Sequence, residues 1–249
     1  MKHALKNFDV LIVGGGHAGV DAALAASRMG SSVCLITMDK NAIGRMSCNP
    51  SIGGLAKGQM VREIDVLGGI MGIAADSSGL QFKMLNRSKG KSVWSPRAQV
   101  DKRIYEQYVN THIENSTNII IVEGEVVSLL LENSSVAGVC LRGGNNFYAR
   151  SVVLTCGTFL NGLIHVGERK IHAGRMGEES SEGITEYLIS LGFVGGRLKT
   201  GTPPRLIADS VDWKKTNEIF GDKRPTPFSY RTTEFNPPNV PCFTALTNS

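Results

Sequence analysis

A turn of closely spaced glycines near the amino terminus constrains the fold more than any other part of this sequence. An apolar run, Phe8–Val13, leads directly into the motif GGGHAG at Gly14–Gly19. An alanine-rich stretch follows and ends at Gly30, and a second apolar run covers Ser32–Thr37. A strand, a glycine turn, a helix and a second strand in this order predict a βαβ unit that binds a dinucleotide.

The three glycines of the GxGxxG pattern have different expected tasks. Gly14 allows the tight turn, Gly16 lets the backbone approach a pyrophosphate, and Gly19 lets the helix pack closely on the strand. The amino terminus of the helix then faces the phosphates, where its N–H groups attract negative charge. The pattern therefore predicts that the pyrophosphate of a cofactor binds at this turn.

The residue that would hold the ribose of the cofactor is left open by the sequence. An acidic residue is expected at the end of the second strand, about 20 residues beyond the glycines. Thr37 occupies that position, and Asp39 follows two residues later. Asp39 would serve after a small shift in register, but it fits a solvated turn residue equally well.

Short β-rich runs separated by Asn, Ser and Gly begin at Asn118 and end with Ser151–Thr155. This last run and the CGT that follows resemble the strand and turn that close the first half of an FAD domain. The predicted fold class is α/β: a Rossmann-type FAD-binding domain of the two-dinucleotide-binding flavoprotein type with a β-meander, plus the start of a second inserted domain. FAD is favoured over NAD because simple dehydrogenase domains lack the meander.

The expected domain boundary lies where the chain becomes rich in proline and threonine. Residues 1–202 are expected to form the first, incomplete part of the FAD-binding domain. Residues 203–249 would begin a second, substrate- or NAD-associated domain that stops without a closing element. The sequence therefore looks like the amino-terminal portion of a longer protein.

Composition narrows the functional classes only slightly. Lys and Arg number 27 against 22 Asp and Glu, and the formal charge of +5 is a mild indication of an anionic partner. The five cysteines form no CxxC pair, which indicates neither a metal site nor a disulfide framework. Asp9 interrupts the first apolar run, so a strand is predicted there and not a signal peptide, and no run reaches transmembrane length. The expected compartment is a reducing cytoplasm.

A single cysteine, Cys48, lies in the glycine-rich segment GRMSCNPSIGGLAKG at Gly44–Gly58. In this fold the segment after the second strand runs back toward the flavin ring, so Cys48 is expected to face the flavin. Asn49–Gly58 contains no second cysteine, which excludes the dithiol relay of disulfide reductases. A reactive nucleophile and an inert, packed thiol both fit this position. Three glycines would let the backbone approach the cofactor: Gly53, Gly54 and Gly58.

Positive charge is concentrated between Lys83 and Arg103, where only Asp101 opposes it. Contact with phosphates and a solvated basic face both fit this cluster. Its members are Lys83, Arg87, Lys89, Lys91, Arg97, Lys102 and Arg103. Farther along, Lys199 and Arg205 flank the turn TGTPP, which either places two cations together or marks a plain domain junction.

Several motifs together resemble one protein family. They include FDVLIVGGGHAG, SCNPSIGGLAKG, GLQFKMLNRSKG, VVLTCGTFLNGLIHVG and GRLKTGTPPR. Over residues 8–205 they closely resemble the large flavoprotein subunit of the tRNA wobble-uridine carboxymethylaminomethyl modification enzyme, the MnmG (GidA) family. The resemblance implies an FAD enzyme that uses methylenetetrahydrofolate and NADH to build a substituent at C5 of the wobble uridine in tRNA. It also implies a homodimer and a GTPase partner, together a heterotetramer of two plus two subunits.

The resemblance also assigns residues. Cys48 matches the thiol implicated in the family's chemistry, and Val126 matches the position whose backbone meets the adenine. The implied cofactor contacts are Gly14, Gly15, Gly16, His17, Ala18, Gly19, Val126 and Ser181. The implied tRNA contacts are Lys89, Lys91, Arg97, Lys199 and Arg205. Lys91, Trp94 and Pro96 depart from the family pattern, which bears on the tRNA contact and not on the cofactor site.

Two alternatives to this function remain at the level of the sequence. The first is the folate- and FAD-dependent tRNA uridine methyltransferase, a shorter relative that lacks SCNPSIGG. The second is a flavoprotein without activity, either a module that binds a partner or an inactive fragment.

Overall fold

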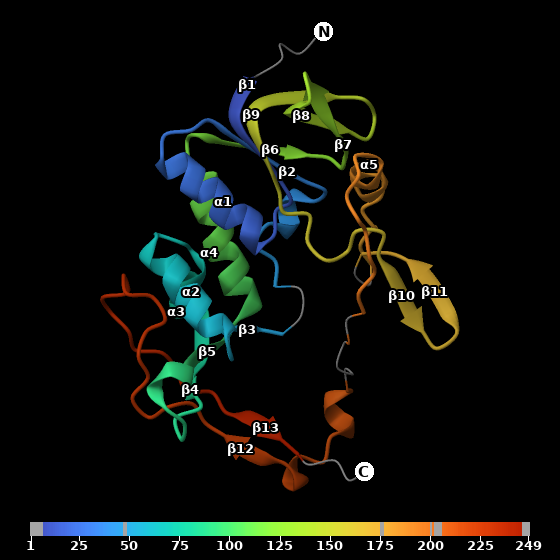
Figure 1. Cartoon of the computed structure of the whole chain (residues 1–249). Coiled ribbons are helices and arrows are strands. Elements are labelled where there is room, and N and C mark those ends of the chain that lie inside the picture. Colours follow the sequence, from blue (N-terminus) through green and yellow to red (C-terminus); the bar gives the residue numbers. More distant parts are fainter. Residues whose placement is uncertain (1–6, 47–48, 175–176, 200, 202–205, 246–249) are drawn as a thin grey trace. The chain divides into compact units, whose positions relative to one another are not determined.

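The computed structural model describes residues 7–46, 49–174, 177–199, 201 and 206–245. The chain forms two compact units, whose elements are labelled in Figure 1. The first comprises Met1–Arg45 and Val109–Arg197, and the second comprises Met46–Tyr108 and Leu198–Ser249. Met46–Tyr108 thus belongs to the same unit as the chain after Leu198, although Val109–Arg197 separates the two segments in the sequence. The assignment of residues 1–202 to cofactor binding and of 203–249 to a second domain stays a prediction.

A six-stranded sheet organises the first unit, in the order β6-β2-β1-β9-β8-β7. The first four strands are parallel, and β8 and β7 extend the sheet as an antiparallel meander. The strands are β1 (Asn7–Val13), β2 (Val33–Thr37), β6 (Ile119–Glu123), β7 (Val126–Glu132), β8 (Ser135–Leu141) and β9 (Asn146–Leu154). A parallel sheet begun by a βαβ unit and extended by a β-meander confirms the predicted Rossmann-type FAD-binding fold.

The helix α1 (His17–Arg28) joins β1 to β2 and packs against both strands. Its buried residues include Val20, Ala23 and Leu24. Ala23 and Leu24 lie three and four residues after Val20, so all three are on the same side of the helix and face the sheet. The helix ends beside Gly30, whose φ of +84° suits the residue after a helix terminus. The predicted helix and its glycine stop are thereby confirmed.

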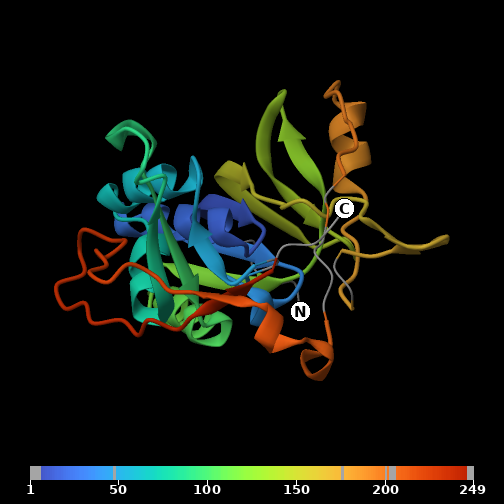
Figure 2. The same cartoon turned by 90° about the horizontal axis from the view of Figure 1, so that it is seen from below.

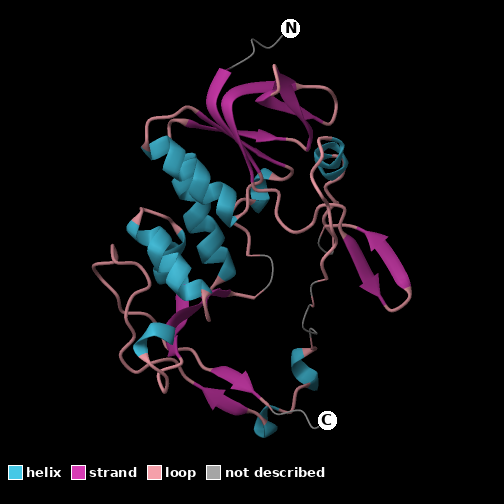
Figure 3. Cartoon of the chain, viewed as in Figure 1, coloured by secondary structure: helices cyan, strands magenta, loops and turns pink. Residues whose placement is uncertain are grey.

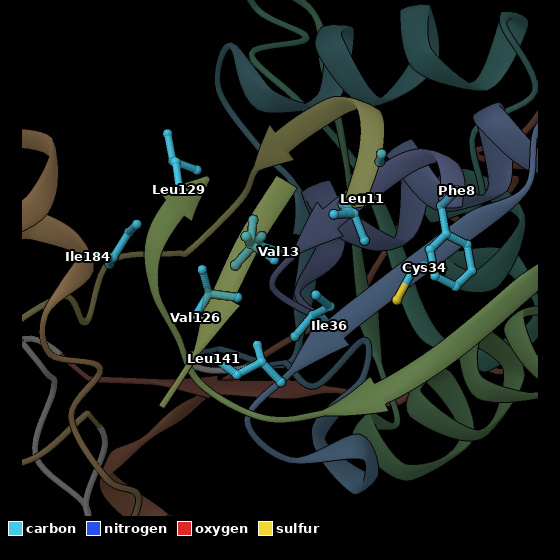
Figure 4. Packing of buried hydrophobic residues seen from close by; sticks show 11 residues of the cluster. Phe8, Leu11, Val13, Cys34, Ile36, Val126, Leu129, Leu141 and Ile184 are labelled. Carbon is cyan, nitrogen blue, oxygen red and sulfur yellow. The ribbon is translucent and has the colours of Figure 1, made fainter. Parts of the chain in front are cut away.

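A hydrophobic core lies between the parallel strands and the meander (Figure 4). Leu11 and Val13 of β1 and Cys34 and Ile36 of β2 occupy alternate positions, so their side chains point to one face of the sheet. The labelled core residues are Phe8, Leu11, Val13, Cys34, Ile36, Val126, Leu129, Leu141 and Ile184. Burial raises the pKa of the Cys34 thiol to about 12, so this cysteine stays protonated and serves in packing.

Two further elements complete the first unit. The helix α5 (Ile184–Ser190) packs against β7. The strands β10 (Leu163–Val166) and β11 (Arg169–His172) pair as an antiparallel hairpin, which projects from the rest of this unit in Figure 2. The sequence patterns do not predict this hairpin. Among the described residues, no helix is long and apolar enough to cross a bilayer.

The second unit is built on a three-stranded antiparallel sheet in the order β3-β5-β4. Its main elements are β3 (Ser51–Gly53), α2 (Lys57–Val66), α3 (Met71–Ser78), β4 (Gly79–Leu85), η2 (Lys91–Val93) and β5 (Ser95–Val100). The later chain is mostly loop in Figure 3. It contains η3 (Ala208–Ser210), η4 (Trp213–Lys215), β12 (Asn217–Ile219) and β13 (Cys242–Thr244). The helix α4 (Lys102–Glu114) contributes residues to both units.

Two carboxylates fasten the later chain of the second unit to its helices. Asp65 of α2 accepts hydrogen bonds from the Ser229 hydroxyl, the Tyr230 N–H and the Arg231 guanidinium, at 2.6, 2.9 and 2.9 Å. Asp76 of α3 accepts bonds from the N–H groups of residues 228 and 229, at 2.6 and 2.9 Å. Burial alone would raise the pKa of Asp65, but the bonds from Ser229, Arg231 and Tyr230 outweigh it and lower that pKa.

Asp65→Asn should lower the free energy of unfolding of the second unit by about 2–3 kcal/mol, because it breaks an ion pair whose carboxylate is fully buried. Asp212→Asn is the matched control. Its carboxylate is exposed and pairs with Lys215 at 3.2 Å, so the expected loss is at most about 0.5 kcal/mol. Urea unfolding measures both variants. Equal losses for the two would contradict this account of Asp65.

Candidate functional site

The candidate site lies at the carboxyl edge of the parallel strands, where dinucleotides bind in folds of this type. Backbone hydrogen bonds align the strand ends there. The Gly14 N–H donates to Ile36 O at 2.7 Å, the Gly124 N–H to Thr37 O at 2.8 Å, and the Thr155 N–H to Val13 O at 2.8 Å. The glycine turn thus lies level with the ends of β2, β6 and β9.

The three glycines of the motif have different surroundings. Gly14 has φ +108°, and a Cβ there would lie 2.3 Å from Thr155 O. A Cβ at Gly19 would lie 1.8 Å from Gly14 O, so only glycine lets the helix start so close to the turn. A Cβ at Gly16 would meet nothing within 4 Å. Gly16 therefore borders open space, which fits the place of a pyrophosphate.

The start of α1 is suited to bind an anion. Gly16 is its N-cap and has no side chain to cap the helix, and the first turn carries no acidic residue. Gly16 and Ala18 are exposed, and His17 is partly exposed. The first N–H groups of a helix carry partial positive charge and attract phosphate. The chain's own residues therefore fit the pyrophosphate of a dinucleotide at this turn.

Of the two ribose candidates, the geometry favours Asp39. Thr37 is buried beneath the glycine turn, and its hydroxyl donates to Asp39 O at 3.2 Å. The Asp39 side chain is 47% exposed. Its carboxylate also accepts a bond from the Asn41 N–H at 2.8 Å and lies 3.6 Å from Arg45. An accessible carboxylate beside the end of β2 is what a ribose hydroxyl requires.

Val126 and Ser181, far apart in the sequence, lie on segments that the structure joins. Val126 begins β7, directly after the turn at Gly124 that bonds to the end of β2. Ser181 O accepts from the Asn161 N–H at 2.8 Å, and the N–H of the next residue, Glu182, donates to Glu125 Oε1 at 2.7 Å. The turn before Val126 and the segment around Ser181 are thereby linked.

Sequence reasoning missed Thr155, which locks the glycine turn in place. Its hydroxyl donates to Val13 O at 2.7 Å and lies 3.2 Å from Gly14 O. The signal was available, since Thr155 is the last residue of the last predicted strand run. Its contribution depends on the parallel pairing of β9 with β1, which the sequence alone does not specify.

The glycine-rich segment 44–58 is more regular than expected. It contains β3, and α2 begins at Lys57. A Cβ at Gly53 would lie 2.3 Å from Pro96 O, and one at Gly58 would lie 2.4 Å from the same oxygen. These two glycines are therefore required for packing against β5, which explains them without a cofactor. Gly54 borders open space.

Two predicted site residues, Cys48 and Arg205, lie outside the described residues. Lys199 is described and exposed. The structure therefore does not test the expectation that Cys48 faces the flavin, nor that Lys199 and Arg205 act together. These assignments stay predictions.

Most of the basic cluster lies on the β4–β5 ribbon of the second unit, and its last two residues, Lys102 and Arg103, begin α4. Lys89 and Lys91 are exposed in the connection between the two strands, and Lys83 and Arg97 are cross-strand partners. Arg87 is committed to other contacts: it pairs with Asp222 at 2.9 Å and lies over the Trp94 ring at 5.7 Å. Lys89 and Lys91 thus form an exposed basic tip, called the ribbon tip below.

Comparison with known proteins identifies the family. The family model described as "Glucose inhibited division protein A" (GIDA) matches residues 9–249. The chain belongs to this family. It is 49% identical over 243 residues to the "tRNA uridine 5-carboxymethylaminomethyl modification enzyme MnmG" of Thermodesulfovibrio yellowstonii, and this match covers 98% of the chain. The chain spans 39% of that relative's length.

Solved structures agree with the assignment to the GIDA family. GidA from Aquifex aeolicus superposes with a TM-score of 0.92 at 45% identity, covering 98% of this chain and 41% of that one. A GidA-related protein from Thermus thermophilus superposes with a TM-score of 0.51 at 19% identity, covering 87% and 73% of the two chains, and shows the fold alone. The resemblance inferred from the motifs is confirmed.

Proposed function

We propose that the chain carries the FAD-binding site of an enzyme that modifies uridine in tRNA. The observation that carries this proposal is the 49% identity to a tRNA uridine modification enzyme over almost the whole chain. It is supported by the glycine turn, because Gly14 and Gly19 lack room for any side chain and Gly16 borders open space.

The product we propose is the carboxymethylaminomethyl group at C5 of the wobble uridine, as in the name of the relative. Methylenetetrahydrofolate and NADH are the proposed co-substrates. The proposed assembly is a homodimer with a GTPase partner, two plus two subunits, working in the cytoplasm. These finer points rest on the resemblance to the family.

Each group of residues has a task in this proposal. The N–H groups at Gly14–Gly19 bind the pyrophosphate, Asp39 binds the ribose, and Val126 and Ser181 contact the adenosine half. FAD, when bound, supplies reversible two-electron chemistry. Cys48 acts next to the flavin, either as a nucleophile or as an acid that moves a proton.

Mass spectrometry of nucleosides tests the function. The intact natural protein is incubated with its candidate GTPase partner, both co-substrates and unmodified tRNA. We expect a carboxymethylaminomethyl group on the wobble uridine, and none when the folate is left out. A methyl group at C5 would instead indicate the uridine methyltransferase, and an unchanged uridine with bound FAD would indicate a flavoprotein without this activity.

The ribbon tip provides a prediction for the contact with tRNA. The double variant Lys89→Glu/Lys91→Glu should bind tRNA more weakly and keep its flavin content. Each phosphate contact removed lowers the slope of log affinity against log salt by roughly one. Filter binding of tRNA at several salt concentrations, together with the flavin absorbance, measures both effects.

The control for this prediction reverses the same number of charges elsewhere on the second unit. Lys214 and Lys215 are adjacent and exposed. Lys214→Glu/Lys215→Glu should lower the slope less than the ribbon-tip variant does. Equal slopes in the two variants would indicate that the ribbon tip is a solvated basic face and does not contact tRNA.

A further inference from the structure

An ion pair at the open end of the β7–β8 hairpin lies against the predicted adenosine half of the cofactor site. Glu125 immediately precedes β7, and Arg142 immediately follows β8. The Arg142 Nε and Nη2 atoms both donate to the Glu125 carboxylate, the latter at 3.1 Å. This two-pronged geometry is stronger and more directional than a single contact between charges. The bond from Arg142 lowers the pKa of Glu125, so the carboxylate is ionised at neutral pH.

The same pair binds both backbone groups of one residue, Glu182, in the segment after β11. Glu125 Oε1 accepts from the Glu182 N–H at 2.7 Å, and Arg142 Nη2 donates to Glu182 O at 3.0 Å. Ser181 precedes this residue, and its own carbonyl accepts from the Asn161 N–H. The peptide group that follows Ser181 is therefore bonded on one side to Asn161 and on the other to Glu125, and Glu125 belongs to the turn before Val126.

We propose that Glu125 and Arg142 are positioning residues that hold Ser181 against the adenosine half of the bound dinucleotide. This inference rests on the proposed FAD site. The pair itself need not touch the cofactor. It fixes the distance between the two chain segments to which we assign the contact with the cofactor: the start of β7 at Val126 and the segment that contains Ser181.

A purely stabilising role is a weaker account of the same geometry. The Arg142 side chain is 58% exposed and that of Glu125 is 15% exposed, and an ion pair whose cation is open to water adds little to the stability of a fold. The packing of α5 on β7 and the burial of Ile184 hold the next helix without it. Loss of the pair should therefore free the backbone around Ser181 while the unit stays folded.

Three variants of the intact natural protein separate the two accounts. Glu125→Ala removes the acceptor for the Glu182 N–H, whereas Glu125→Gln keeps a neutral acceptor in the same place. Arg150→Gln is the matched control, since Arg150 is 87% exposed and pairs with Asp9 at 3.9 Å on β1 of the same sheet. The dissociation constant for FAD is measured by quenching of flavin fluorescence. Stability is measured by urea unfolding of the apoprotein.

We expect Glu125→Ala to raise the dissociation constant for FAD about tenfold, equivalent to about 1.4 kcal/mol. Glu125→Gln should raise it about threefold, and Arg150→Gln should leave it unchanged. The unfolding midpoint of the apoprotein should fall only slightly in the two Glu125 variants and stay the same in Arg150→Gln, and the Glu182 amide should exchange hydrogen faster in Glu125→Ala.

Two results would overturn the positioning role alone: unaltered affinity in Glu125→Ala, or a loss of affinity that only follows a loss of apoprotein stability. If the unaltered protein did not bind FAD, the proposed cofactor would be overturned first and this role with it. The unaltered protein therefore distinguishes failure of the cofactor assignment from failure of the positioning role.

Discussion

Gly16→Val should abolish FAD binding, raising the dissociation constant more than about a hundredfold, while the protein stays folded. Gly16 has φ −73°, a conformation that valine adopts without strain, and a Cβ there meets no atom within 4 Å. The cost in the free protein is limited to about 1 kcal/mol for a poorer helix cap. The valine methyl groups would, however, occupy the space that we assign to the pyrophosphate.

Two other glycines make this prediction specific. Gly19→Val should prevent correct folding, because its Cβ would lie 1.8 Å from Gly14 O. Gly90→Val should change neither FAD binding nor folding, since the nearest atom to a Cβ there is 3.9 Å away. The measurements are FAD released on denaturation and the thermal unfolding midpoint. Retention of FAD by a folded Gly16→Val protein would contradict the proposed cofactor site.

Cys48→Ser should lower tRNA modification at least about a hundredfold, with FAD content and thermal stability unchanged. Serine has nearly the volume of cysteine, but a hydroxyl is far less ionised than a thiol near neutral pH. Pro50 restricts Asn49, the residue after the thiol, to an extended conformation. The assay is mass spectrometry of nucleosides from tRNA incubated with the complete system.

A second cysteine provides the control. Cys140 is partly buried on β8, within the meander. The Cys140→Ser variant should modify tRNA at the same rate as the unaltered protein. If Cys48→Ser did so too, Cys48 would be a packing residue, and the chemistry that we assign to its thiol would belong to another group.

The βαβ unit and the meander could be predicted because local physics specifies them. Phe8–Val13 is apolar, Gly14–Gly19 has the glycine spacing that a phosphate turn needs, and Gly30 ends the helix. Each of these signals lies within a few residues in the sequence. The fold and the pyrophosphate turn therefore follow from short stretches of chain.

The contacts that join distant segments could not be predicted in the same way. Asp65 and Arg231 are 166 residues apart, and Glu125 and Glu182 are 57 apart. Charged residues of these types are common, and nothing in the local sequence marks the pairs. The packing role of Gly53 and Gly58 could not be predicted for a related reason: their neighbour is Pro96, which lies on β5 and is far from them in the sequence.

Hydrogen exchange with and without FAD tests the central claim most directly, because it reports both the ligand and its place. Apoprotein is prepared from the intact natural protein, and the exchange of backbone amides is followed by mass spectrometry. FAD should slow exchange in peptides covering residues 14–19, 124–127 and 180–183. FMN, which lacks the pyrophosphate and the adenosine, should give much less protection there. Equal protection by FMN, or protection by FAD that leaves residues 14–19 unchanged, would contradict a dinucleotide site at the glycine turn.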